Sequence, residues 1–392
     1  MAFMGLKSCF MRQLWQGVVV VGMLISVAHA EIIVPAPPAL DDKAYLVMDF
    51  ESGQVLAAKN ADLRLGPASL TKLMTSYIVE RALLEGRLHE DDTVSVSDKA
   101  WRHGSNQEST MFLPVNGQVR VIDLLRGIIV VSANDACTAV AEHIAGTESA
   151  FAEMMNSTAQ QLGLSNTHYM NASGLPDPQH YSSARDLATL ARTIIRDNAH
   201  YYPIYSEREF AWGGHTQGNR NALLYTDPTV DGLKTGHTEE SGYSLVASAK
   251  RHGMRLIVVV LGTDSMQARA DQPRALLNWG YSFFETVVPY HSGTPLTKAP
   301  VWFAQQDTVS AGLGSDLALT IPKGSQSGLR ASIVLNPNLQ APIAKGQVVG
   351  KVVTTLNGKP YAEQPLIALE SDEQAGFFKR LWQHILRFLH LR

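Results

Sequence analysis

The sequence predicts an α+β protein in which a large domain of helices and antiparallel strands is followed by a small all-β domain and a C-terminal amphipathic helix. Three observations support this prediction. Of the 392 residues, 45% are hydrophobic and 18% are charged, which is enough apolar material for the cores of two domains. Segments of helical and of strand-like spacing share the chain as far as residue 290. From about residue 291 to 370, only short alternating strands separated by turn residues are expected.

Composition and charge exclude several classes of protein. A chain this apolar is not disordered, and its 30 glycines and 18 prolines follow no collagen-like period. The net charge of −3 offers no general surface for nucleic acid, so no nucleic-acid partner is expected. Residues 1–30 carry two cations and residues 376–392 carry four, with no acid in either segment, so residues 31–375 carry a net charge of −9. A basic tail on an acidic body indicates a specific role for the tail.

Residues 1–30 are typical of a secretory signal peptide. Two cations precede the apolar run 18–25, and Ala28-His29-Ala30 forms a cleavage site of small residues. A permanent N-terminal membrane helix is the alternative, which the short apolar run disfavours. We therefore expect an exported protein whose mature chain begins at Glu31.

The expected mature chain keeps one cysteine, Cys137, because Cys9 lies in the signal segment. A single cysteine cannot form an internal disulfide. Cys137 lies next to Ala136 and Val140 on an expected helix, so we interpret it as a buried, unreactive thiol rather than a reactive one.

Gly, Pro and clusters of polar residues divide residues 31–290 into helices and strands. The expected elements are, in order, a hairpin over 43–59, a helix over 69–84, a loop-rich stretch over 91–120, a helix from Asp123 to a break at 132–134, a helix from there to Ile144, helices over 148–162 and 183–197, strands over 232–238, 241–249 and 254–262, and a helix over 273–285. Hydrophobic periodicity supports each helix, and alternation supports each strand.

The remainder of the chain contains a small domain and a tail. Within 291–370, Pro322-Lys323-Gly324 and Asn357-Gly358 mark turns between strands. Residues 371–392 hold an acidic linker and the segment 377–392, whose apolar side chains fall on one half of a helix and whose basic side chains fall on the other. Such a helix is too short and too charged to span a bilayer, but it suits a membrane surface. We favour this interpretation over packing on the protein's own core.

Three short motifs occur in order along the chain: Ser69-Leu70-Thr71-Lys72, Ser132-Ala133-Asn134 and Lys234-Thr235-Gly236. One S-x-x-K alone is expected by chance roughly once in a chain of this length. The joint occurrence of the three motifs is not expected by chance, because the first opens a helix, the second lies at a break between helices and the third lies on a strand.

The chemistry of these residues indicates nucleophilic catalysis. Residues i and i+3 share a helix face, so Lys72 can reach the hydroxyl of Ser69. Ser69 is then the candidate nucleophile and Lys72 its general base, if burial and a second cation, Lys234, lower the lysine pKa from its usual value of about 10.4. Ser132 can relay a proton to the leaving group, and the amide of Asn134 can position a substrate amide.

The strand over 232–238 can hold an extended peptide through its backbone, so Thr235 and Gly236 are expected to contact substrate. The backbone N–H groups of Ser69 and His237 can form an oxyanion hole, and Lys234 can meet a substrate carboxylate. No cofactor and no metal are expected, because the 13 histidines show no His-x-x-x-His or His-x-His spacing.

With these motifs, the sequence resembles the low-molecular-mass penicillin-binding proteins that act as D-alanyl-D-alanine carboxypeptidases, which are serine peptidases of the β-lactamase-like superfamily. The resemblance runs from about residue 36 to 392. It includes the flanks of all three motifs and the stretch Asn171-Ala172-Ser173-Gly174-Leu175. It implies a β-lactamase/transpeptidase-like catalytic domain over 31–290, a β-rich domain over 291–370, and a linker with an amphipathic anchor helix over 371–392.

The resemblance also implies the reaction and its setting. The enzyme would remove the terminal D-alanine from peptidoglycan pentapeptide stems on the periplasmic face of the inner membrane, and penicillins would acylate it. Arg269, after the last catalytic strand, would meet the carboxylate of the substrate, and residues 101–112 would border the active site. Ala133 departs from the commoner middle residue of the second motif, where no side-chain role is assigned.

Other functions are weighed against this one. A serine β-lactamase of class A needs a Glu for deacylation, and no Glu-x-x-x-Asn occurs between Ala145 and Lys234; Glu148 and Glu153 are expected to be solvated. A D,D-endopeptidase of cell-wall cross-links would use the same acyl-enzyme and stays open. An inactive cell-wall-binding protein is disfavoured because all the motif side chains are present, and a metallopeptidase is disfavoured by the histidine spacing.

Overall fold

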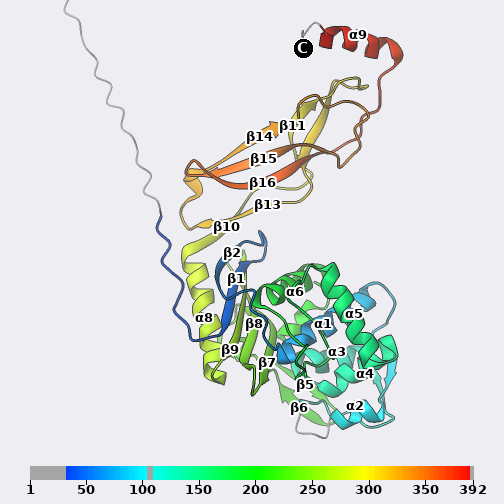
Figure 1. The fold of residues 1–392 in the computed structure, drawn as a ribbon, viewed down its shortest axis with the longest axis vertical. Helices are drawn as coiled ribbons and strands as arrows, with labels where there is room; N and C mark the ends of the chain where they lie inside the picture. Colours follow the sequence, from blue (N-terminus) through cyan, green and yellow to red (C-terminus); the bar gives the residue numbers. More distant parts are fainter. Residues whose placement is uncertain (1–31, 104–108, 389–392) are drawn as a thin grey trace, which may run out of the picture. The chain divides into compact units, whose positions relative to one another are not determined.

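The computed structural model describes residues 32–103 and 109–388. The predicted signal peptide, residues 1–30, lies outside the described residues. Helices and strands are mixed in the first part of the chain and strands dominate the second, so the predicted α+β class is confirmed (Figure 1).

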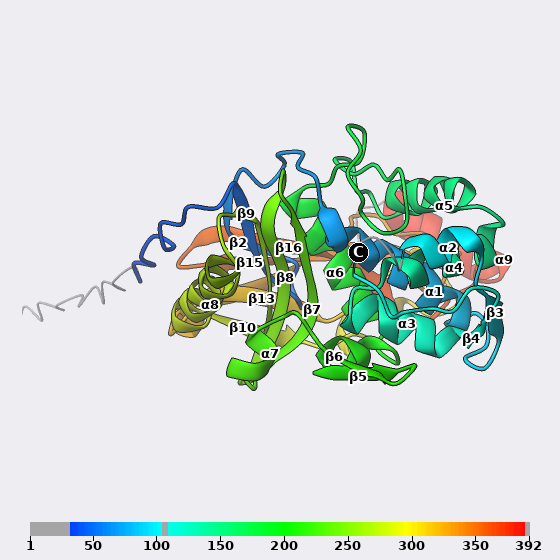
Figure 2. The same cartoon turned by 90° about the horizontal axis from the view of Figure 1, so that it is seen from below.

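A five-stranded antiparallel sheet organises the larger part, in the order β2-β1-β9-β8-β7. Its strands are β1 (Ala44–Asp49), β2 (Val55–Lys59), β7 (Val230–Thr238), β8 (Gly242–Arg251) and β9 (Met254–Thr263). The central strand β9 is a nearly continuous buried apolar run because helices cover both faces of the sheet. Helix α8 (Met266–Phe283) lies on one face and α6 (Ala184–Asp197) on the other (Figure 2). Strand β7 is at the edge of the sheet.

Most of the remaining helices form a subdomain beside β7. The short α7 (Leu223–Thr226) packs with α8 on the other face of the sheet, so the subdomain consists of α1 (Lys72–Leu84), α2 (Asp98–His103), α3 (Val121–Val130), α4 (Asn134–Ala145) and α5 (Glu148–Gln161). Two small hairpins join them, namely β3 (Thr93–Ser95) with β4 (Gln118–Arg120) and β5 (Glu209–Trp212) with β6 (His215–Gly218). One hydrophobic core runs from α1, α3 and α4 to the adjacent sheet face.

Helix α8 begins seven residues before the start that was expected at 273. The side chain of Ser265 accepts a hydrogen bond from Ala268 N at 3.0 Å and caps the helix there. Pro273 therefore lies inside the helix, where it removes one backbone donor. Ser265 supplies the N-terminal signal of this helix, ahead of the expected start.

The second part of the chain is built from strands. A five-stranded antiparallel sheet has the order β11-β12-β16-β15-β14, and β10 pairs separately with β13. The strands are β10 (Phe284–Tyr290), β11 (Pro295–Pro300), β12 (Thr308–Leu313), β13 (Leu317–Pro322), β14 (Leu329–Leu335), β15 (Val348–Leu356) and β16 (Lys359–Ala368). The predicted turn at Asn357-Gly358 joins β15 to β16, with both residues at positive φ, as a tight hairpin requires.

The last described element is α9 (Phe377–Phe388). In residues 32–103 and 109–388, no helix has both the length and the hydropathy needed to cross a membrane.

Candidate active site

The three motifs meet at one cavity of about 320 Å³ between β7 and the helical subdomain. Seven of the nine predicted site residues line it: Ser69, Ser132, Asn134, Thr235, Gly236, His237 and Arg269. The other two, Lys72 and Lys234, are buried and lie close to the site, since the amine of Lys72 contacts Ser69 and Lys234 precedes Thr235 on β7. The structure thus brings together residues that are up to 200 positions apart.

Ser69 lies in a single 3₁₀ turn, Ala68–Thr71, that leads directly into α1. Two close backbone approaches hold this turn. A Cβ on Gly236 would lie 2.8 Å from the carbonyl oxygen of Pro67, and a Cβ on Gly174 would lie 1.8 Å from that of Ala68. Only glycine allows β7 and the 171–175 loop to pack this tightly against the turn that carries the nucleophile.

Lys72 is fully buried at the first position of α1. Its Nζ lies 3.0 Å from Ser69 Oγ, 2.7 Å from Asn134 Oδ1 and 2.7 Å from the carbonyl oxygen of Ser173. The predicted contact between Lys72 and Ser69 is therefore present. The two carbonyl oxygens can only accept hydrogen bonds, whereas the hydroxyl of Ser69 can also donate one.

Ser132 and Asn134 occupy the break between α3 and α4. Ser132 has a φ of 62°, a left-handed conformation that is strained for a non-glycine residue and that is typical of functional sites. Its Oγ is buried and has no hydrogen-bond partner among the described residues. Backbone bonds from Ala133 N to Gly127 O and from Asn134 N to Ser109 O hold the break in place.

Four basic side chains lie at the cavity: Lys72, Lys234 and Arg269 are buried, and Arg220 is exposed. Burial and the nearby charge of Lys72 hold the pKa of Lys234 well below its usual value. Burial likewise lowers the pKa of Arg269. Basic side chains gathered at one cavity are suited to an anionic group such as a terminal carboxylate.

Sequence reasoning did not find Arg220, which lies just after β6 and whose NH1 donates to Ser109 Oγ. It also missed Asp135, a buried carboxylate that accepts hydrogen bonds from Met111 N and Leu113 N and so holds the segment after residue 108. Neither residue belongs to a motif with fixed spacing. The one available signal was the position of Asp135 directly after Ser132-Ala133-Asn134.

One expectation is wrong. Glu148 is not solvated: it is 8% exposed, and its carboxylate pairs with Lys99 Nζ at 2.7 Å. The reason is that the 171–175 loop covers Glu148, and the N–H of Ala172 donates a hydrogen bond to its carboxylate. Glu153 is exposed, as predicted. Cys137 is buried, as predicted, and burial raises the pKa of its thiol to about 12. Within 32–103 and 109–388, no group of three His, Cys, Asp or Glu residues could hold a metal ion.

The fold and the site together define a serine hydrolase of the penicillin-recognising type. Comparison with known proteins specifies the family. Residues 31–265 match the D-alanyl-D-alanine carboxypeptidase family, and residues 284–374 match the C-terminal domain of penicillin-binding protein 5. The chain belongs to the D-alanyl-D-alanine carboxypeptidase family, and it is a serine-type D-Ala-D-Ala carboxypeptidase.

Individual relatives agree over most of the chain. It is 43% identical over 376 residues to the D-alanyl-D-alanine carboxypeptidase DacA of Escherichia coli, covering 93% of both chains. It is 46% identical over 354 residues to DacA of Haemophilus influenzae, covering 89% of this chain and 90% of that one. The crystal structure of penicillin-binding protein 5 from H. influenzae superposes with a TM-score of 0.84 at 45% identity, covering 87% of this chain and all of that one. Penicillin-binding protein D2 of Listeria monocytogenes, solved with ampicillin bound, matches with a TM-score of 0.57 at 28% identity, covering 63% of this chain and all of that one.

Proposed function

We propose that the enzyme removes the terminal D-alanine of peptidoglycan stem peptides through an acyl-enzyme on Ser69, with Lys72 as general base. The observation that carries this proposal is the 3.0 Å contact between a fully buried amine and the hydroxyl of Ser69. A neutral Lys72 satisfies its surroundings: its N–H groups can donate to Asn134 Oδ1 and the Ser173 carbonyl, which leaves its lone pair for the hydroxyl proton of Ser69.

The reaction then proceeds in two halves. Lys72 takes the Ser69 proton while Oγ attacks the carbonyl carbon of the penultimate D-alanine, and the backbone N–H groups of Ser69 and His237 hold the oxyanion. The C–N bond breaks, and Ser132, whose buried Oγ faces the cavity, passes the proton to the departing amine. A water molecule, deprotonated by the same base, hydrolyses the ester and regenerates Ser69.

Substrate orientation comes from β7 and the cations. As an edge strand, β7 pairs with β8 on one side only, so its other backbone edge is available to an extended peptide. Thr235 and Gly236 lie on this strand, and Asn134 faces it across the cavity to hold a peptide amide. Arg269 and Lys234 attract the C-terminal carboxylate of the substrate. Arg220, which the sequence did not indicate, lines the same cavity and attracts the same group.

The experiment that tests this mechanism uses Ser69→Ala and a diacyl tripeptide ending in D-Ala-D-Ala. Release of D-alanine and covalent labelling by a fluorescent penicillin should both be abolished, because a β-lactam acylates the same hydroxyl. Ser149→Ala, which changes an exposed serine on α5, is the matched control and should retain both. Labelling of the Ser69→Ala protein would assign the nucleophile to another residue. Rapid turnover of penicillin by the native enzyme would instead favour a β-lactamase, and cleavage of cross-linked dimers would favour an endopeptidase.

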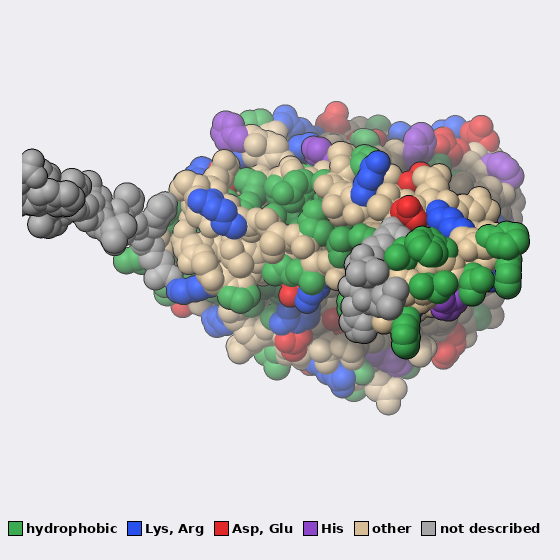
Figure 3. Space-filling view, turned by 90° about the horizontal axis from the view of Figure 1, so that it is seen from above, with side chains coloured by type: hydrophobic (Ala, Val, Ile, Leu, Met, Phe, Trp, Pro, Cys, Tyr) green, Lys and Arg blue, Asp and Glu red, His purple; other side chains and the backbone are tan. Residues whose placement is uncertain are grey.

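We further propose that the enzyme is exported and attached to the periplasmic face of the inner membrane through 377–392. The polar side of α9 is engaged by the chain itself. Gln383 is buried and donates to Asp307 Oδ1 at 3.1 Å, and Lys379 Nζ pairs with the same carboxylate at 3.3 Å. The apolar side is exposed, and its large side chains are Phe377, Phe378, Leu381, Trp382, Ile385 and Phe388. Hydrophobic side chains gather along this part of the molecule in the space-filling view (Figure 3).

This arrangement supports a membrane partner for the apolar face, because six large exposed side chains on one short helix are rare on a protein that faces only water. Part of the polar face packs on the chain itself, through Gln383 and Lys379. Deleting 377–392 should shift the enzyme from sedimenting with anionic liposomes to the supernatant, with unchanged activity on short peptides. Trp382→Asp should mimic the deletion, whereas Val334→Asp, at an exposed apolar position on β14, should not. Equal sedimentation of the truncated and full-length proteins would exclude this role.

A further inference from the structure

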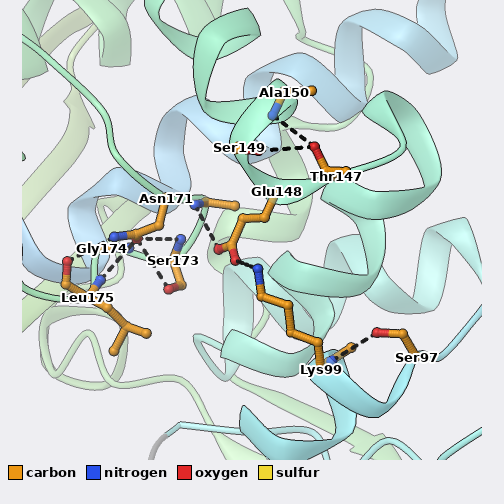
Figure 4. Close-up of polar contacts among 12 residues, drawn as sticks. Ser97, Lys99, Thr147, Glu148, Ser149, Ala150, Asn171, Ser173, Gly174 and Leu175 are labelled. Atoms are coloured by element: carbon orange, nitrogen blue, oxygen red, sulfur yellow. Dashed lines mark hydrogen bonds and ion pairs between the residues drawn. The ribbon is translucent and has the colours of Figure 1, made fainter.

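An ion pair between a buried carboxylate and an exposed lysine lies near the active site and is not part of the reaction described above. Glu148, the first residue of α5, directs Oε2 to Lys99 Nζ at 2.7 Å and accepts Ala172 N on Oε1 at 3.3 Å (Figure 4). Lys99 lies on α2, whose first turn is capped by Ser97. The carboxylate thus connects two helices to a loop that lines the catalytic cavity.

The loop bonded to Glu148 also contacts the proposed general base. Thr75 Oγ1 on α1 donates to the carbonyl of Ala172 at 2.7 Å, and the next carbonyl, that of Ser173, accepts Lys72 Nζ at 2.7 Å. Asn171 Oδ1 accepts the N–H groups of the residues that follow, from Ser173 to Leu175 (Figure 4). Three consecutive peptide groups, from Asn171 to Gly174, are therefore held by Glu148 at the first and by Thr75 and Asn171 at the next two.

We propose that Glu148 is a positioning residue for acylation, which acts by holding the Ser173 carbonyl against Lys72; the proposal rests on the assignment of Lys72 as general base. Without Glu148, the buried N–H of Ala172 loses its acceptor, and the 171–174 backbone must rotate or move to find another. The Ser173 carbonyl moves with it. Lys72 then loses an acceptor that directs its lone pair toward Ser69, and displacements of this size near reacting atoms reduce rates strongly.

Lys99 gives the carboxylate a counter-charge, since a buried carboxylate without a cation or donors is strongly unfavourable. The hydrogen bond to Ala172, however, needs only an oxygen acceptor. Glutamine has one at the same place and carries no charge. Glu148→Gln therefore separates the two roles, because it keeps the acceptor for Ala172 N and removes the ion pair with Lys99.

The test compares Glu148→Ala with Glu148→Gln in the full chain. We expect Glu148→Ala to lower kcat for the D-Ala-D-Ala tripeptide and the rate of acylation by fluorescent penicillin on the order of 10- to 100-fold, with KM for the tripeptide nearly unchanged. Glu148→Gln should recover most of the lost rate. Thr147→Ala is the matched control: it removes the side chain that caps the same helix through Ala150 N, so it should lower the unfolding temperature but leave kcat intact.

A second variant covers the case in which Glu148→Ala does not fold. Thr75→Val removes the donor to the Ala172 carbonyl with little change in shape, and it should lower the acylation rate in the same direction. Unchanged kcat in both Glu148→Ala and Thr75→Val, or a glutamine variant as slow as the alanine variant, would overturn the proposal. Failure of the underlying assignment is distinguishable, because a Lys72 that is not the general base would appear as unchanged acylation by penicillin in Lys72→Arg.

Discussion

Glu80 on α1 gives the stability of the enzyme an unusual pH dependence. The side chain is completely buried, accepts Asn198 Nδ2 at 2.6 Å and Tyr205 OH at 2.9 Å, and burial raises its pKa to about 8. The pKa of Tyr205 is held well above its usual value by burial, so this tyrosine does not titrate in the same range. Between about pH 5 and pH 8, the folded chain therefore keeps a proton on Glu80 that the unfolded chain has released.

Because the folded state binds more protons than the unfolded state in this window, stability must fall as the pH rises. The slope is about 1.4 kcal/mol per pH unit, which amounts to roughly 4 kcal/mol between pH 5 and pH 8. Glu80→Gln removes the titration and can keep the hydrogen bonds, since Asn198 Oδ1 has no partner among the described residues and can accept from the new amide. We expect the variant to gain stability over the native enzyme as the pH rises.

The measurement is denaturant unfolding of both proteins at pH 5, 6, 7 and 8, followed by fluorescence. Other groups titrate equally in both proteins, so the difference between their free energies of unfolding isolates Glu80. Glu153→Gln, at an exposed position of α5, is the control and should give a difference within about 0.5 kcal/mol at every pH. A difference between the native enzyme and Glu80→Gln that does not change with pH would refute the reasoning.

Two further predictions concern the cations of the site. Lys72→Arg keeps a long basic side chain but cannot lose its proton to act as a base, so acylation should fall by about 10²–10⁴-fold, whereas Lys234→Arg keeps a cation for the carboxylate and should lose less. Equal losses in the rate of penicillin labelling would contradict these separate roles. Arg220→Gln should raise KM for the D-Ala-D-Ala peptide at least roughly tenfold, with a smaller effect on a peptide whose C-terminus is amidated; an unchanged KM would remove Arg220 from substrate binding.

The helices and strands that position the site were largely predictable from hydrophobic periodicity and from the Gly, Pro and polar residues between them. The break at 132–134 was expected between two helices, and it separates α3 from α4. The strand with Lys234-Thr235-Gly236 was expected over 232–238, and it is β7. Boundaries set by a side-chain cap were less predictable, as the early start of α8 shows. A cap depends on one serine whose surroundings the sequence does not reveal.

The C-terminal helix shows a second limit of sequence reasoning. The amphipathic pattern correctly predicts two faces, but it does not say what each face contacts. Only the structure shows that Gln383 and Lys379 bind the 303–307 segment while the aromatic side chains remain exposed. A hydrophobic pattern specifies which side chains avoid water, and polar side chains can be satisfied by water, head groups or protein alike.

The site residues also differ in how far the sequence could predict them. Ser69 and Lys72 must share a helix face to exchange a proton, so their chemistry demands a fixed spacing that appears in the sequence. Arg220, Asp135 and Glu148 act through charge or through the backbone of a loop, and their partners lie 22 to 111 residues away. Any chain segment that delivers a charge or an acceptor to the same point in space would serve. Such residues therefore leave no motif, and they can be found only by tracing what holds each reacting group in place.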